Sequence, residues 1–162
     1  MSRIGFGTDI HKLVSGRRLV LGGLEIESEL GAEGHSDADA LTHAITDAIL
    51  GALGLGDIGT HFPNSDERWR NAESFLFLKY AAGLVQEHGY TIGNVDSVVT
   101  LETPVLRPYI DRIRESLANV LAVERVCVNV KAKSNERLDA IGRGEGVKAE
   151  AIVLLERAPG RE

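Results

Sequence analysis

Amphipathic helical patterns alternate along this chain with short runs typical of β-strands, and this alternation constrains the fold more than any other feature. Helices are predicted at 36–52, at 72–88, where Gly89 ends the pattern, and from Pro108 through Leu121. Strands are predicted at 3–7, 18–26, 91–101, 126–132 and 147–155. We therefore expect one α/β (α+β) domain over residues 1–162. It would hold a mixed four-stranded sheet with helices packed on one face, plus a short β-hairpin.

Composition limits the class of protein and its partners. With 24 acidic residues against 18 Lys and Arg, the net charge of -6 argues against a general nucleic-acid or membrane surface. A phosphorylated ligand would then need local cations. One cysteine, Cys127, cannot form an internal disulfide, and no leader peptide or membrane span is evident, so we expect a cytoplasmic protein. The chain has 18 glycines among 162 residues. This share is above the average of about 7% and indicates many positions with tight turns or close backbone contacts.

Asp9, His11 and His43 form the first candidate site. Asp9 and His11 are two residues apart in an extended segment, so their side chains leave the same face, and His43 lies on the polar face of the first helix. Two imidazoles and a carboxylate with a fourth position open are typical of catalytic zinc. The alternative is a pair of ordinary surface or core histidines. Asp47, one turn from His43, either orients that imidazole or belongs to a solvated helix face.

Phosphate groups have two further candidate sites. His35 and Ser36 lie where the first helix begins, and free N–H groups there attract anions; alternatively Ser36 only caps the helix. The segment 131–136 ends a cation-rich strand, and its Glu136 could bind a hard cation such as Mg²⁺. In the glycine-rich run 142–146, Arg143 and Glu145 more often indicate a structural ion pair than a phosphate contact. Asp57 follows a glycine turn that can aim it into a cleft, or is only a turn residue.

The combined motifs resemble the 2-C-methyl-D-erythritol 2,4-cyclodiphosphate synthase family over essentially the whole chain. The motifs that carry this resemblance are Gly7-Thr8-Asp9-Ile10-His11, His35-Ser36-Asp37-Ala38-Asp39, Thr46-Asp47-Ala48, Gly56-Asp57-Ile58-Gly59, Phe62-Pro63, Gly93-Asn94-Val95-Asp96, Asn129-Val130-Lys131-Ala132 and Gly142-Arg143-Gly144-Glu145-Gly146.

The resemblance implies a lyase of the non-mevalonate isoprenoid pathway. Its substrate would be 4-diphosphocytidyl-2-C-methyl-D-erythritol 2-phosphate, whose 2-phosphate attacks the β-phosphorus to give the cyclic diphosphate and CMP. By similarity, Asp9, His11 and His43 would hold zinc or another divalent transition metal. Mg²⁺ or Mn²⁺ on the diphosphate would lie near Glu136, and His35 and Ser134 would be the catalytic residues.

The resemblance also implies a homotrimer with active sites between subunits, and no nucleic-acid or membrane partner. Residues expected to bind the cytidine diphosphate substrate are Asp9, His11, His35, Ser36, Asp57, Ile58, Gly59, Phe62, Asp66, Leu101, Pro104, Leu106, Arg107, Lys133, Ser134, Glu136 and Arg143.

Two dipeptides depart from the usual family pattern. Lys133-Ser134 replaces Thr-Thr, which keeps one hydroxyl and adds a charge, and Asp139-Ala140 replaces Gly-Phe, which removes an aromatic wall. Two other functions therefore stay open: a metal-stabilised trimeric binding protein without turnover, and a generic zinc phosphohydrolase.

Overall fold

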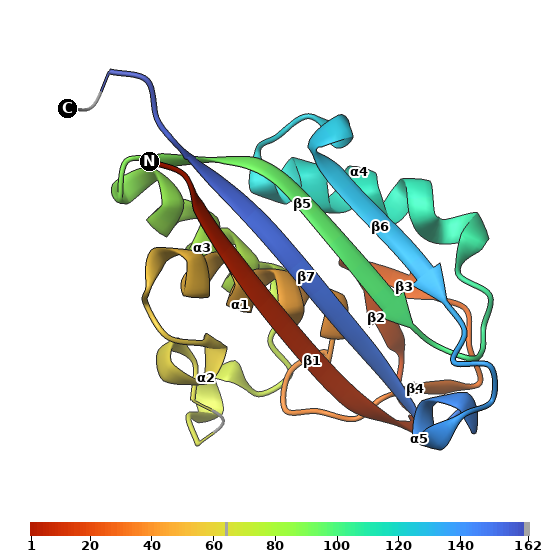
Figure 1. Cartoon of the computed structure of the whole chain (residues 1–162). Coiled ribbons are helices and arrows are strands. Elements are labelled where there is room, and N and C mark those ends of the chain that lie inside the picture. The colour runs from red at the N-terminus through yellow and green to blue at the C-terminus, as the bar shows by residue number, and fades with distance from the viewer. Residues whose placement is uncertain (64, 161–162) are drawn as a thin grey trace.

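The computed structural model describes residues 1–63 and 65–160, so residues 64, 161 and 162 of the expected domain lie outside it. Its main sheet has the strand order β4-β1-β7-β5-β6 (Figure 1). The bounds are β1 Arg3–Ser15, β4 Leu30–Ala32, β5 Tyr90–Thr100, β6 Val128–Lys133 and β7 Gly146–Arg157. β5 and β6 are parallel and the other neighbours are antiparallel, which confirms a mixed sheet.

The strand number is a correction, because the sheet has five strands and not four. The added strand β4 is three residues long and pairs with the end of β1, from Leu13 opposite Ala32 to Ser15 opposite Leu30. Strand β1 itself continues to Ser15 and does not end at Gly7, because it pairs with β7 from Arg3 to Lys12. Asp9 and His11 therefore lie within the sheet.

The short hairpin is confirmed, formed by β2 (Leu19–Leu21) and β3 (Leu24–Ile26). Gly22 and Gly23 form the turn between these two strands. Their φ angles of 59° and 71° are both left-handed, as a two-residue hairpin turn requires.

Three longer helices cover one face of the sheet and leave the other face bare, as Figure 1 shows. They are α1 (Ala40–Leu53), α3 (Ser74–Glu87) and α4 (Ile110–Leu121). Short helical turns complete the chain: α2 Ile58–His61, α5 Asp139–Gly142, and the 3-10 turns η1 Glu67–Trp69, η2 Arg107–Tyr109 and η3 Arg125–Cys127. α5 lies between the predicted strands 126–132 and 147–155, where the sequence pattern predicted no helix. Within the described chain, no helix has the length and apolarity needed to cross a membrane.

Helix α1 begins later than predicted, with Asp39 as its N-cap and not Ser36. The fully buried Asp39 carboxylate accepts hydrogen bonds from the Thr42 N–H (3.0 Å), the Gly22 N–H (3.0 Å) and the Gly23 N–H (2.7 Å). The cap thus ties α1 to the hairpin turn. The Asp39 carboxylate therefore already satisfies one free N–H group of this helix N-terminus, and the phosphate contact near His35 and Ser36 stays a prediction.

Close backbone packing sets the position of α1 over the sheet. A Cβ atom on Gly5 would lie 1.8 Å from the Ala48 carbonyl oxygen, and one on Gly7 would lie 2.1 Å from that of Ala44. Ala44 and Ala48 are themselves fully buried. Small residues on both elements therefore let β1 and α1 approach closely, and this brings His43 of α1 over Asp9 and His11 of β1.

Candidate metal site and its cavities

Asp9, His11 and His43 converge on one point between β1 and α1. Asp9 Oδ2 lies 2.9 Å from His11 Nε2 and 2.9 Å from His43 Nδ1, and the two nitrogens are 3.3 Å apart. The three side chains offer two imidazole nitrogens and one carboxylate oxygen within 4.8 Å of one another. This donor set suits a borderline divalent metal more than calcium, so the residues present fit such an ion.

Each histidine is oriented by a partner on its far nitrogen. His11 Nδ1 lies 2.9 Å from the Glu33 carbonyl oxygen, which can only accept, so Nδ1 carries a proton and Nε2 is the nitrogen whose lone pair is left for a metal ion. His43 Nε2 lies 2.7 Å from Ser74 Oγ.

Asp47 does not orient His43, and that prediction is wrong. Its Oδ1 instead accepts a hydrogen bond from the Ile58 N–H at 2.7 Å. The glycine turn after α1 folds the start of α2 back onto Asp47, and this backbone donor takes the carboxylate.

Asp9 and His11 shift each other's pKa in opposite directions. Burial alone would raise the pKa of Asp9, but hydrogen bonds and charge interactions with His11 and His43 hold it well below its usual value. Burial acts to lower the pKa of His11, yet the bond to Asp9 and its charge raise it overall. Asp9 is therefore ionised at neutral pH, which is the form that binds a cation.

A cavity of about 220 Å³ adjoins the three metal-binding side chains. Of the predicted substrate residues, it is lined by Asp9, His11, His35, Ser36, Ile58, Gly59 and Phe62. His35 Nε2 and Trp69 Nε1 are buried without a hydrogen-bond partner in the described part of the chain. An unpaired imidazole nitrogen here is consistent with a group that contacts a ligand.

Trp69 and Phe77 also line this cavity, and the sequence analysis did not single them out. Their rings pack with Phe62 at centroid distances of 5.0 and 4.5 Å. The only signal in the sequence is the scarcity of aromatic residues, 5% of the chain, several of which cluster in 62–80.

Two predicted residues lie beside this cavity without lining it. Asp57 is exposed and caps α2, where it accepts hydrogen bonds from the Thr60 N–H and Oγ, both at 2.8 Å. Asp66 caps η1 and pairs with Arg68 at 2.6 Å.

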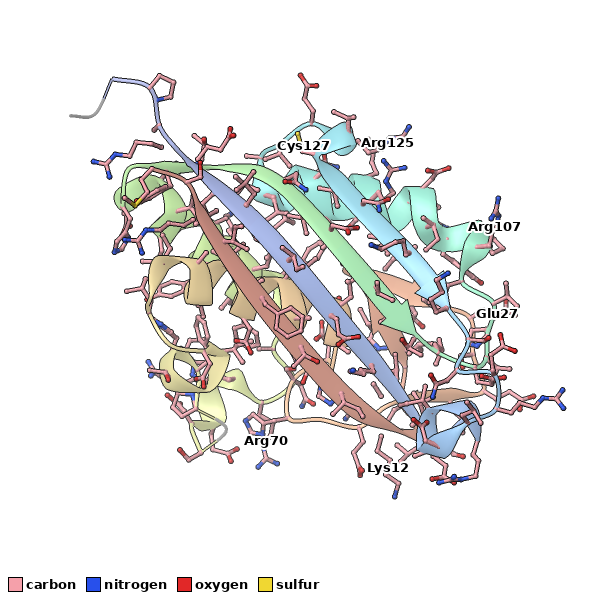
Figure 2. All side chains as sticks on the ribbon, in the orientation of Figure 1. Lys12, Glu27, Arg70, Arg107, Arg125 and Cys127 are labelled. Carbon is pink, nitrogen blue, oxygen red and sulfur yellow. The ribbon has the colours of Figure 1, made fainter. Side chains whose placement is uncertain are left out.

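A second cavity, of about 650 Å³, lies between the ends of β5 and β6 and the start of α4. It brings together the predicted residues Leu101, Pro104, Leu106, Arg107, Lys133 and Ser134. Figure 2 shows Arg107 at the outer edge of the molecule where α4 begins. Glu102 was not predicted; its carboxylate accepts from the Asn135 N–H at 3.0 Å and so holds the loop that follows β6.

The loop after β6 has an unusual backbone. Glu136, Arg137 and Asp139 have φ angles of 50°, 61° and 54°, in the left-handed region. Ser134 Oγ donates to Glu136 Oε1 at 3.0 Å. Strained backbone of this kind is common at ligand sites, and aspartate at 139 adopts it more readily than most residues other than glycine.

The two cavities share no lining residue, so Ser134 is not brought together with His35 in the described chain. Arg143 lines neither cavity. Its guanidinium is paired with Glu145 at 2.7 Å, as the ion-pair alternative predicted.

Comparison with known proteins identifies the class. Residues 2–156 match the YgbB family. A Fusobacterium nucleatum 2-C-methyl-D-erythritol 2,4-cyclodiphosphate synthase is 51% identical over 97% of this chain and 98% of its own length. The structure of a 2-C-methyl-D-erythritol 2,4-cyclodiphosphate synthase in its CDP-bound form covers 95% of this chain and 100% of its own, with 43% identity and a TM-score of 0.88. A bifunctional IspDF from Campylobacter jejuni aligns with a TM-score of 0.93 and 38% identity over 97% of this chain, which spans 42% of that protein.

The chain therefore belongs to the YgbB family. This confirms the family resemblance, and with it an enzyme of the lyase class rather than a binding protein without turnover. The function that the relatives share is that of a 2-C-methyl-D-erythritol 2,4-cyclodiphosphate synthase in isoprenoid biosynthesis.

Proposed function

We propose that this chain, as one domain over residues 1–162, closes the cyclic diphosphate of 4-diphosphocytidyl-2-C-methyl-D-erythritol 2-phosphate and releases CMP. An oxygen of the 2-phosphate would attack the β-phosphorus, and the bond from this phosphorus to the oxygen bridging it to the α-phosphate would break. The bridging oxygen leaves with CMP. The observation that carries the proposal is the cluster of Asp9, His11 and His43 beside a cavity that contains His35.

Asp9, His11 and His43 would hold zinc, or another divalent transition metal. When bound, this ion supplies positive charge and Lewis acidity to a phosphate oxygen of the substrate. His35 adds a hydrogen-bond donor at the same cavity, because its buried Nε2 has no partner among the described residues. Positioning and charge neutralisation, and not a covalent intermediate, would account for most of the rate.

Ser134 and Glu136 would act on the cytidyl side of the diphosphate. Ser134 lines the larger cavity and keeps a hydroxyl that can donate to a developing phosphate charge. Glu136, 3.0 Å from Ser134 Oγ, would bind Mg²⁺ or Mn²⁺ that accompanies the substrate phosphates. The CDP-bound form of a relative supports a cytidine diphosphate site, and we assign that site to the larger cavity.

Asp57 would bind the hydroxyls of the methylerythritol group. Its hydrogen bonds with Thr60 lower the pKa of its carboxyl group, so Asp57 is ionised and can accept from sugar-alcohol hydroxyls. The predicted residues that line the two cavities would shape them, namely Ser36, Ile58, Gly59, Phe62, Leu101, Pro104, Leu106, Arg107 and Lys133. Asp66 and Arg143 line neither cavity and would also contact the substrate.

A homotrimer with active sites between subunits would join the two cavities. The sheet face without helices exposes Ile4, Phe6, Ile10 and Ile152 by 72%, 59%, 61% and 49%. Contiguous apolar surface of this kind is typical of subunit interfaces. Because His35 and Ser134 lie in separate cavities of one chain, each site would take one cavity from each of two subunits.

We place the enzyme in the cytoplasm, and its lone Cys127 supports this location. It would have no nucleic-acid or membrane partner, which its net charge of -6 supports.

The direct test is CMP release from the cytidyl substrate with zinc and Mg²⁺ present. Formation of the cyclic diphosphate supports the proposal, whereas inorganic phosphate or a phosphomonoester would indicate a zinc phosphohydrolase. Absence of CMP release by protein with bound zinc would refute turnover.

Complementation tests the shared sites. His35→Ala and Ser134→Ala each inactivate one half, and subunits exchanged at equal ratio should rebuild about a quarter of wild-type sites, because each site draws its halves independently from two subunits. A mixture of His35→Ala with His43→Ala is the matched control and should stay inactive, because both changes lie in the same half. Equal activity in the two mixtures would rule out sites between subunits.

A further inference from the structure

A chain of hydrogen bonds lies behind His43, on the side away from Asp9 and His11. His43 Nε2 is 2.7 Å from Ser74 Oγ, and Ser74 Oγ makes a short hydrogen bond to Asp37 Oδ1. The other oxygen, Asp37 Oδ2, accepts from the Ser74 N–H at 3.0 Å. Ser74 is fully buried and is the first residue of α3.

The direction of these bonds follows from the donors available. An ionised Asp37 carboxylate only accepts, so the Ser74 hydroxyl donates its one proton to Asp37. The Ser74 oxygen must then accept the proton on His43 Nε2. With a metal ion held beside Asp9, this leaves the lone pair of His43 on Nδ1, the nitrogen that lies 2.9 Å from Asp9 Oδ2. Ser36 Oγ lies farther from His43 Nε2, at 3.3 Å, and already accepts from the Ala38 N–H.

The backbone around Ser74 also fixes the segment that carries His35. The Asn71 N–H donates to the His35 carbonyl at 2.8 Å, and the Asp37 N–H donates to that of Ala72 at 3.1 Å. The segments 35–37 and 71–74 are thus joined by backbone and side-chain bonds, so Asp37 and Ser74 cannot move apart without disturbing both.

We infer that Asp37 and Ser74 are positioning residues for His43: together they fix the tautomer and ring orientation in which Nδ1 faces the metal position. The inference rests on the zinc site of the proposed function and goes beyond it, since neither residue would touch metal or substrate. The Glu33 carbonyl fixes His11 in the opposite tautomer, because it accepts from Nδ1 and leaves Nε2 for the metal position. Loss of such partners of a metal-bound histidine typically weakens metal binding by about 10–100-fold.

The test compares zinc affinity, measured by chelator competition, in wild-type protein, Ser74→Ala, Asp37→Asn and Ser97→Ala. Ser97 is a matched control because it is also a buried serine (1% exposed), and its hydroxyl bonds the Asn129 carbonyl far along the chain from His43. We expect affinity about 10–100-fold weaker in Ser74→Ala and weaker in Asp37→Asn, with Ser97→Ala unchanged. Ser74→Ala with the affinity of wild-type protein would overturn the inference.

A spectroscopic measurement separates orientation from general destabilisation. In the zinc-loaded wild-type protein, the His43 Nε2–H proton should give a low-field, slowly exchanging NMR signal, which shifts in Asp37→Asn and is unchanged in Ser97→Ala. Absence of that signal from the wild-type protein would overturn the inference even if Ser74→Ala fails to fold. If the wild-type protein does not bind zinc, the proposed zinc site fails and this inference with it; if it binds zinc and Ser74→Ala binds equally, only the inference fails.

Discussion

Substitution of Gly7 by alanine tests whether the close approach of β1 and α1 builds the metal site. The added Cβ would lie 2.1 Å from the Ala44 carbonyl oxygen and 2.7 Å from the Ala48 nitrogen. Both are backbone atoms of α1, so no side-chain rotation relieves the clash. Ordinary van der Waals contact begins at 3.4 Å, whereas the added Cβ would lie 2.1 Å from the Ala44 oxygen. Strand β1 and helix α1 would therefore have to move apart by about 1.3 Å.

This shift has two consequences of known size. Overpacking in a well-packed interior costs about 1–3 kcal/mol of the free energy of unfolding. The same movement separates His43 on α1 from Asp9 and His11 on β1, whereas functional sites need their groups within about 0.5 Å of the productive geometry. Gly7→Ala should therefore lose both stability and zinc affinity.

The assay is urea unfolding of metal-free protein at one fixed protein concentration, followed by zinc titration at a urea concentration where all variants are folded. Gly83→Ala in α3 is the control, because an added Cβ there meets nothing within 4 Å. It should raise the free energy of unfolding by about 0.5–1 kcal/mol, as expected for glycine to alanine within a helix. If Gly7→Ala unfolds at the wild-type urea midpoint and binds zinc normally, the packing argument is refuted.

Three further predictions concern the metal, the phosphate contact and the helix cap. When free zinc is one hundred times the Kd, its binding stabilises the folded protein by about 2.7 kcal/mol, so chelation of zinc should lower the Tm by about 5–11 °C. Calorimetry with and without EDTA checks this, and equal Tm values would contradict it. His35→Ala should reduce kcat for CMP release by about 10²–10³-fold with zinc content unchanged, so a matching loss of zinc would point to a structural role. Asp39→Ala leaves the N–H groups of Thr42, Gly22 and Gly23 without their acceptor, and at about 1–3 kcal/mol each the free energy of unfolding should fall by at least about 3 kcal/mol; a loss below about 1 kcal/mol in urea unfolding would contradict that role.

Local periodicity was enough to predict that Asp9, His11 and His43 could converge on one ion. Asp9 and His11 share a face because side chains in a strand alternate, and His43 lies opposite the apolar stripe of its helix. Partners that depend on distant segments could not be predicted in this way. Ser74 lies 31 residues beyond His43, and no local pattern indicates that α3 begins against that imidazole.

Competition between local signals explains the errors at α1. Ser36 and Asp39 are both good caps, and the choice was made by tertiary bonds from Asp39 to Gly22 and Gly23. A bond to a residue outside the helix also decided the role of Asp47, because its carboxylate accepts from the Ile58 N–H of α2 and not from His43. Strand β4 and helix α5 have three and four residues, too few for a period to be recognised. The substrate contacts came from the family resemblance, since nothing in their spacing brings Leu101 and Lys133 together.

The aromatic wall of the smaller cavity has an optical consequence. Trp69 is the single tryptophan of the chain, and its indole stands edge-on to Phe62 at 5.0 Å in the cavity beside Asp9, His11 and His43. Fluorescence excited at tryptophan wavelengths therefore comes from one place in the chain, next to the proposed chemistry. The intrinsic fluorescence of Trp69 can therefore report binding of a metal or a phosphate in the smaller cavity in real time. Because Trp69 does not line the larger cavity, this signal is separate from ligand binding there.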